Sequence, residues 1–115
     1  MSKTSRIAEL NDLCRKAPDS SDQMYLTQGV TYLPYADLSA IYEKVQRFDS
    51  FTPDNDPDCE HDFGAFEHAG HKILWKIDYY DRASYGTGGG NRLSEDPANP
   101  ATTVRVLTIM LAEEY

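Results

Sequence analysis

The stretch EHDFGAFEHAGHKILWKIDYY, residues 60–80, decides the fold of this chain. Two runs of apolar and aromatic residues flank Ala69-Gly70, and a two-residue connection of this kind joins the strands of a tight β-hairpin. Such a turn fixes the register, because each residue before it must pair with one after it. The predicted pairs, counted outward from the turn, are His68–His71, Glu67–Lys72, Phe66–Ile73, Ala65–Leu74, Gly64–Trp75, Phe63–Lys76, Asp62–Ile77 and His61–Asp78.

The alternation of a strand then divides the hairpin side chains between two faces. The predicted core face consists of Phe66, Ile73, Trp75 and Ile77. Gly64 lies opposite Trp75 in this register, and a position without a side chain leaves room for the large indole ring. The opposite face gathers His61, Phe63, Lys76, Asp78 and Tyr80.

Two segments outside the hairpin have clear helical patterns. Residues 5–16 place apolar side chains on one face, and Pro18 ends the pattern. Residues 36–48 carry apolar side chains at i, i+3, i+4, i+7 and i+10, which is the spacing of one helix face. This stripe consists of Leu38, Ile41, Tyr42, Val45 and Phe48.

Two further segments are less regular. Residues 23–33 are rich in Tyr, Leu, Val and Thr, which predicts a strand followed by a turn or bulge at Gly29. Residues 100–113 follow Asn99, a good helix-capping residue, and are interpreted as a third helix. Their content of Thr, Val and Ile leaves a strand as the alternative.

The expected fold is α+β, with a small antiparallel sheet centred on the hairpin and helices packed on one face. A chain of 115 residues is long enough for one hydrophobic core, so residues 1–115 form a single domain. The glycine-rich segment 83–98 is expected to be a mobile loop. Cys14 and Cys59 lie far apart, and no signal peptide or membrane-spanning segment is visible. These features predict a cytoplasmic protein with reduced thiols.

Negative charge is concentrated just before the aromatic strand. The chain has a net charge of −8, and no Lys or Arg lies between Phe48 and His71. Seven acidic residues lie there, namely Asp49, Asp54, Asp56, Asp58, Glu60, Asp62 and Glu67. Crowded like charges destabilise a folded chain, so a functional use is expected. Direct nucleic-acid binding is excluded because phosphates require clusters of Lys and Arg.

The acidic block and the adjoining rings together form the predicted partner-binding surface. Carboxylates attract a basic surface, whereas aromatic rings supply the contact area that charges alone lack. The residues assigned to this surface are Asp54, Asp56, Asp58, Glu60, Asp62, Asp78, Tyr79, Tyr80 and Asp81.

A catalytic or metal-binding site on the same strands is the alternative. A carboxylate opposite an imidazole can fix its tautomer, as a general base requires, so His61, Asp78 and Lys76 are the candidate catalytic residues. A divalent cation would be held by His61, Asp62 and Asp78. The competing interpretation of His61 and Asp78 is an ordinary cross-strand charge pair.

Four phrases of the sequence resemble an uncharacterised family. They are FTPDNDP at 51–57, EHDFG at 60–64, WKIDYYD at 75–81 and RVLTIMLAEEY at 105–115. The chain is similar, from about Ile7 to Tyr115, to a domain-of-unknown-function family of small alphaproteobacterial proteins often carried on plasmids and other mobile elements. The resemblance implies no assigned activity. It implies a setting in which small acidic proteins act against host defences, as anti-CRISPR or antirestriction factors.

The leading functional hypothesis is a non-enzymatic inhibitor or adaptor that docks on a basic surface of a nucleic-acid-handling protein, such as a host defence nuclease. The alternatives are a small metal-assisted enzyme and an accessory domain of a plasmid regulator. No cofactor and no membrane partner are expected. The sequence leaves open the identity of the partner and the oligomeric state.

Overall fold

The hairpin forms one edge of the sheet in the computed structural model, which describes residues 2–115. Strands β2 (Phe63–His68) and β3 (His71–Asp81) pair in antiparallel fashion, and the six predicted pairs nearest the turn are confirmed. The Ile77 N–H still donates to the Asp62 carbonyl at 2.8 Å. At His61 the chain turns away with a left-handed φ of 56°. The predicted pairing of His61 with Asp78 is therefore wrong.

The sheet has two inner strands, β3 and β4 (Thr103–Leu111), and β4 pairs antiparallel with β3 and parallel with β1 (Gln23–Leu26). The strand order is β1-β4-β3-β2, so the sheet is mixed. The α+β fold class is confirmed, but the helix predicted at 100–113 is wrong. β4 is buried along almost its whole length, and β-branched residues suit such a strand better than a helix. Only Ala112–Glu114, labelled η1, form a helical turn.

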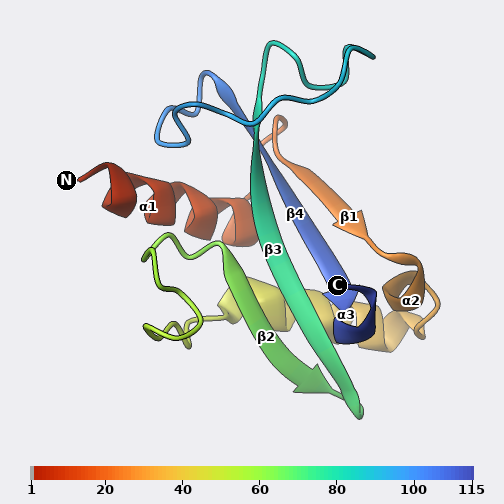
Figure 1. Ribbon diagram of the computed structural model, residues 1–115. Helices are drawn as coiled ribbons and strands as arrows, with labels where there is room; N and C mark the ends of the chain where they lie inside the picture. Colours follow the sequence, from red (N-terminus) through yellow and green to blue (C-terminus); the bar gives the residue numbers. More distant parts are fainter. Residues whose placement is uncertain (1) are drawn as a thin grey trace.

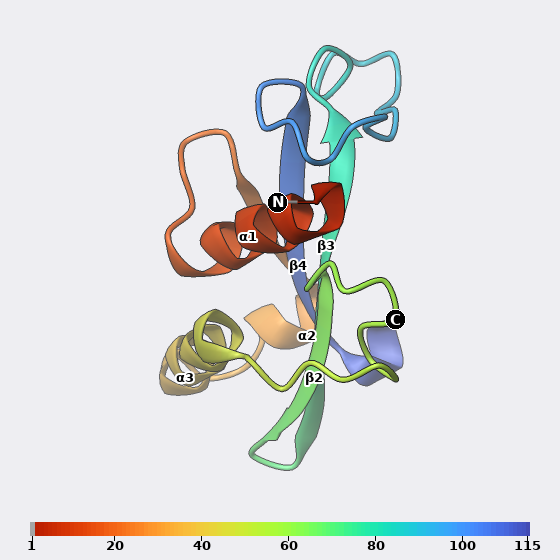
Figure 2. The same ribbon diagram turned by 90° about the vertical axis from the view of Figure 1, so that its left-hand side faces the viewer.

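The helices lie together on one face of the sheet, as Figure 1 and Figure 2 show. α1 spans Lys3–Lys16, α2 spans Gln28–Thr31 and α3 spans Tyr35–Arg47. The helices predicted at 5–16 and 36–48 are thereby confirmed. Gly29, predicted at a turn or bulge, lies in the short α2. No helix among residues 2–115 is long and apolar enough to cross a membrane.

The core lies between this helical layer and the sheet. The predicted core face is confirmed, because Ile73, Trp75 and Ile77 are buried and Phe66 packs against them. Trp75 is fully buried, and its indole lies directly over Gly64. A Cβ atom at Gly64 would lie 2.3 Å from Trp75 Nε1. The glycine is therefore required by close approach of the ring.

None of the three α-helices described within residues 2–115 lies on the other face of the sheet (Figure 2). The register places Lys76, Asp78 and Tyr80 on it, as predicted. Residues 82–102 connect β3 to β4 without a helix or a full strand, so the loop predicted at 83–98 is present. A second long loop, the acidic segment between α3 and β2, passes around the β2 edge of the sheet (Figure 1; Figure 2).

Candidate functional site

Six of the seven acidic residues before the aromatic strand lie in the loop of residues 48–62, called the acidic loop below, whereas Glu67 lies on β2. Asp56, at its centre, is only 5% exposed. Its Oδ1 accepts hydrogen bonds from the N–H groups of Glu60 at 3.0 Å and His61 at 3.1 Å. Cys59 and His61 have φ angles of 57° and 56°, a conformation that costs about 1 kcal/mol or more per residue. Asp56 therefore holds the loop together, and its predicted place on a partner-binding surface is wrong.

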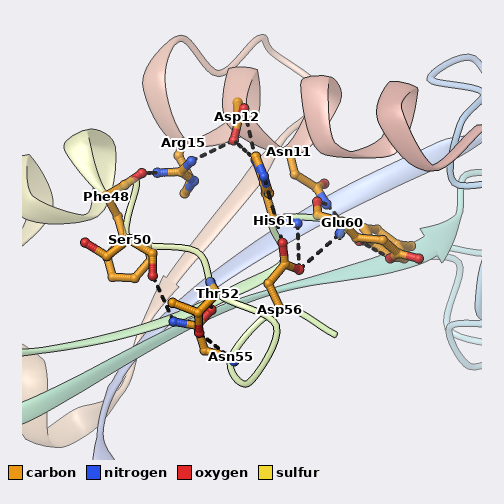
Figure 3. A network of polar contacts seen from close by, with 11 residues as sticks. Asn11, Asp12, Arg15, Phe48, Ser50, Thr52, Asn55, Asp56, Glu60 and His61 are labelled. Carbon is orange, nitrogen blue, oxygen red and sulfur yellow. Dashed lines mark hydrogen bonds and ion pairs between the residues drawn. The ribbon is translucent and has the colours of Figure 1, made fainter. Parts of the chain in front are cut away.

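His61 connects the acidic loop to α1 (Figure 3). Its Nδ1 lies 3.0 and 3.2 Å from the two carboxylate oxygens of Asp12, so this nitrogen carries the proton. Its Nε2 lies 3.8 Å from Asp56 Oδ2. The imidazole also stacks on the Phe51 ring, with centroids 3.9 Å apart and planes 2° from parallel. Both ring nitrogens thus face carboxylates within the protein.

Arg15 anchors this network in the core (Figure 3). Its side chain is 1% exposed, and Nη2 donates to Asp12 at 2.7 Å. Nη1 donates to the carbonyls of Val45 at 2.8 Å and Phe48 at 3.0 Å, where α3 ends. The guanidinium carbon lies 4.8 Å from the centre of the Trp75 ring. One buried cation therefore fixes α1, the end of α3 and the start of the acidic loop relative to one another.

A second buried chain of hydrogen bonds lies beside the first. Asn11 donates to the Glu60 carbonyl at 2.9 Å and to the Tyr79 hydroxyl at 2.7 Å. The Tyr79 hydroxyl donates in turn to Glu60 Oε1 at 2.9 Å, and Arg105 donates to Asn11 Oδ1 at 2.8 Å. Burial raises the pKa of the Tyr79 hydroxyl well above its ordinary value. Tyr79 lies on the core face of β3 and is partly buried there, with its hydroxyl bonded within the protein.

Besides Asp56, the acidic loop contains five carboxylates, and four of them are crowded into residues 54–62. We call Asp54, Asp58, Glu60 and Asp62 the acidic ridge. Asp54 and Asp58 are exposed, whereas Glu60 and Asp62 are partly buried. None of the four forms an ion pair with a Lys, Arg or His within residues 2–115. Burial raises the pKa of Asp62, and the negative charges of Glu60, Asp56 and Asp58 raise it further. The ridge therefore contains crowded negative charge without a cationic partner.

The remaining predicted residues lie elsewhere on the sheet. Asp78 forms an ion pair with Lys76, two residues earlier on the same strand, and Lys76 Nζ lies 3.0 Å from Asp78 Oδ2. This hydrogen bond raises the pKa of Lys76. Asp81 ends β3, and its N–H donates to the Arg92 carbonyl at 2.7 Å. Tyr80 packs against Tyr85 on the uncovered face, with ring centroids 5.6 Å apart.

The residues of the two alternative sites lie apart in the structure. The candidate catalytic residues His61, Asp78 and Lys76 do not come together, because His61 faces Asp12 and Asp56 while Lys76 holds Asp78. The candidate metal ligands His61, Asp62 and Asp78 do not assemble either. In the described part of the chain, no group of three or more His, Cys, Asp and Glu is arranged to hold a metal ion.

Sequence reasoning missed the residues of α1 that position the acidic loop, namely Asn11, Asp12 and Arg15. One signal was available. Asn11 lies four residues after Ile7 and three before Cys14, so it falls on the apolar face of the helix. A polar side chain at such a position requires buried hydrogen-bond partners.

Comparison with known proteins places the acidic loop and all of the hairpin within one family. Residues 26–114 match the model of the family described as "Protein of unknown function (DUF3768)", and the chain belongs to that family. The matched segment also contains β4 but not α1. No curated protein and no solved structure matches the chain.

Proposed function

We propose that this DUF3768 member is a non-enzymatic protein that binds a basic protein surface through its acidic ridge. One observation carries the proposal: four carboxylates without a Lys or Arg partner lie on a loop that buried side chains hold in place. Negative charge that the protein itself leaves uncompensated lowers its stability. A cationic partner would remove that penalty on binding.

The rigidity of the acidic loop favours binding. Arg15, His61 and Asp56 fix its conformation before a partner arrives, so less conformational entropy is lost on association. The uncompensated charge of the ridge also attracts a basic surface over a distance of about 10 Å at moderate salt. Association is therefore expected to be fast at low ionic strength and to slow as salt is added.

Nucleic-acid-handling proteins are the partner class that fits this chemistry. Their phosphate-binding grooves are lined with Lys and Arg, and a row of carboxylates can occupy such a groove in place of phosphates. We propose a cytoplasmic nuclease of a host defence system as the specific partner, so that the protein acts as an anti-CRISPR or antirestriction factor of a mobile element. This narrower step rests on analogy with small acidic proteins of mobile elements that act against host defences.

The test removes the ridge charges without changing the shape of the loop. In the variant D54N/D58N/E60Q/D62N each carboxylate becomes an amide, and Asp56 is kept because it is structural. The control variant E9Q/E43Q/E95Q/D96N removes the same number of negative charges from other parts of the surface. Both proteins are compared with wild type for binding to purified defence nucleases, with and without their nucleic acid.

The ridge variant is expected to bind at least tenfold more weakly than wild type, whereas the control variant binds within about threefold. Nucleic acid should compete with the wild-type protein for the same surface. An equal loss in both variants would show that only net charge matters, and unchanged binding by the ridge variant would eliminate the proposal.

A further inference from the structure

Three tyrosines form a cluster on the sheet face that the helices leave uncovered. They are Tyr25 on β1, Tyr80 on β3 and Tyr85 in the loop that follows β3. The ring centroids of Tyr80 and Tyr85 are 5.6 Å apart, and the hydroxyls of Tyr25 and Tyr85 are 3.4 Å apart. We call this group the tyrosine cluster. It shares no residue with the acidic ridge.

Tyr85 extends across the inner strand β4. β1 and β3 are not neighbours, because β4 lies between them. A side chain that contacts both Tyr80 and Tyr25 must therefore lie over β4. Val104 and Val106 of β4 are each only 5% exposed, although no helix of the described chain packs on their face. The register places Val104 opposite Tyr80, so the tyrosine rings form the cover of these valines.

The tyrosine cluster is partly open to solvent, because Tyr25 is exposed while Tyr80 and Tyr85 are partly buried. Tyr25 is 55% exposed, and Leu93, which pairs with Tyr80 through an isolated bridge, is 72% exposed. Tyrosine combines a large rigid contact area with a polar hydroxyl, which is why it is enriched where proteins bind one another. Three such rings beside an exposed leucine form a contiguous apolar patch, and patches of this kind mark binding surfaces more often than single exposed apolar residues do.

The charge of the molecule identifies what these rings can bind. The negative face of an aromatic ring attracts a cation, and a planar guanidinium stacks on it better than an ammonium does. Arg15, Lys44 and Arg105 lie over other rings, and none of the cation–ring contacts in the described chain involves the tyrosine cluster. The chain also carries a net charge of −8, which favours a basic partner over an acidic one.

We infer that the tyrosine cluster is a second contact surface, which binds arginine side chains of a basic protein partner. The inference rests on the proposed function only in taking the partner to be basic. Part of the acidic loop reaches the same side of the sheet as the cluster (Figure 2). One partner can therefore contact carboxylates and rings together, with the ridge supplying attraction and the cluster selecting arginine over lysine.

The experiment compares two peptides of equal charge, nona-arginine and nona-lysine, by isothermal titration calorimetry on the full chain. Wild type is expected to bind the arginine peptide about fivefold more tightly than the lysine peptide. In the variant Y25L/Y85L, leucine keeps apolar cover but removes the ring faces. The ratio of its affinities for the arginine and lysine peptides should fall to about one, while its affinity for the lysine peptide stays unchanged. In Y25F/Y85F the rings and the preference should both remain.

The outcomes separate this inference from the proposed function. The ridge variant D54N/D58N/E60Q/D62N should weaken both peptides alike and keep the arginine preference. Equal binding of the two peptides by wild type would overturn the arginine site and leave ridge docking standing. An arginine preference that survives in folded Y25L/Y85L, judged by thermal unfolding, would overturn it as well. If wild type bound neither peptide, both the arginine site and ridge docking would be overturned.

Discussion

The two long loops of this protein are held in place in different ways. The acidic loop receives hydrogen bonds and ion pairs from buried side chains of other elements, chiefly Asn11 and Arg15 of α1. The loop of residues 82–102 is held on either side of its glycine-rich segment, because Arg82 donates to the carbonyls of Pro100 and Thr103 and the Ser94 N–H donates to the Tyr79 carbonyl. Its glycine-rich middle has mainly local contacts. Buried polar contacts from outside a loop therefore decide how rigidly it is held, more than the sequence of the loop itself.

The largest effect is expected from Arg15→Met. The methionine fills the site, but Asp12 then keeps only His61 as a partner, and the Val45 and Phe48 carbonyls lose their arginine donor. Losing the hydrogen bonds to the two carbonyls and to Asp12 together is expected to cost about 3–5 kcal/mol in unfolding free energy, which urea unfolding measures. Arg82→Met, in the other loop, is the control and should cost about 1 kcal/mol. Equal losses would contradict the difference between the two loops.

A smaller loss is expected from Asp56→Ala. The N–H groups of Glu60 and His61 lose their shared acceptor, which costs about 2–3 kcal/mol in unfolding free energy. Hydrogen exchange at these two amides should accelerate together with the loss. Asp54→Ala, on the exposed ridge, should change stability by no more than about 0.5 kcal/mol. If Asp56→Ala behaved in the same way, the acidic loop would not depend on its buried carboxylate.

A gain in stability is expected from Asp62→Asn. The pKa of Asp62 in the folded protein lies above the ordinary value of 3.8, so the folded chain holds the proton more tightly than the unfolded chain. The favourable contribution of Asp62 is therefore complete below pH 3.8 and is lost as the pH rises through the folded-state pKa. Asparagine cannot ionise, so the variant should be more stable than wild type at pH 7.

The gain from Asp62→Asn should be smaller than either loss described above, because the carboxylate is only partly buried. It should shrink toward zero at pH 3, where wild-type Asp62 is protonated as well. Thermal unfolding at the two pH values measures the difference. A variant that is less stable at pH 7, or a gain that is the same at both pH values, would argue against crowded charge on the ridge.

The smallest effect is expected from Gly89→Ala in the glycine-rich loop. A Cβ atom there would meet only Thr87 Oγ1, at 3.7 Å, so stability should change by no more than about 0.5 kcal/mol. Gly88 has a φ of +84°, and Gly88→Ala should cost about 1 kcal/mol. A large loss from Gly89→Ala in urea unfolding would mean that this loop is packed as tightly as the acidic loop.

The hairpin could be predicted from the sequence because a local turn determines it. Ala69-Gly70 sets the register, and the alternation of apolar residues then assigns Trp75 to the core. The register failed at His61 because Asp56, five residues earlier, accepts the His61 N–H and draws the chain out of the ladder. That contact depends on a left-handed backbone at two non-glycine residues, which no local pattern signals.

The functional residues of α1 and the conformation of β4 could not be predicted for a different reason. Arg15, Asn11 and Arg105 act through partners that lie 30 or more residues away in the chain, and no periodicity reports such distant contacts. β4 is buried on both faces, so it lacks the alternation that would have distinguished a strand from a helix. Sequence patterns therefore predicted the β2–β3 hairpin but not the inner strand β4.

The strand order has a consequence for how the protein is made. β4 is the last strand along the chain, yet it lies between β1 and β3. During synthesis β1 has no partner, and β3 can pair only with β2, until β4 has left the ribosome. Until that moment the nascent chain exposes open strand edges that invite aggregation. We therefore expect the sheet to fold only after β4 has been synthesised.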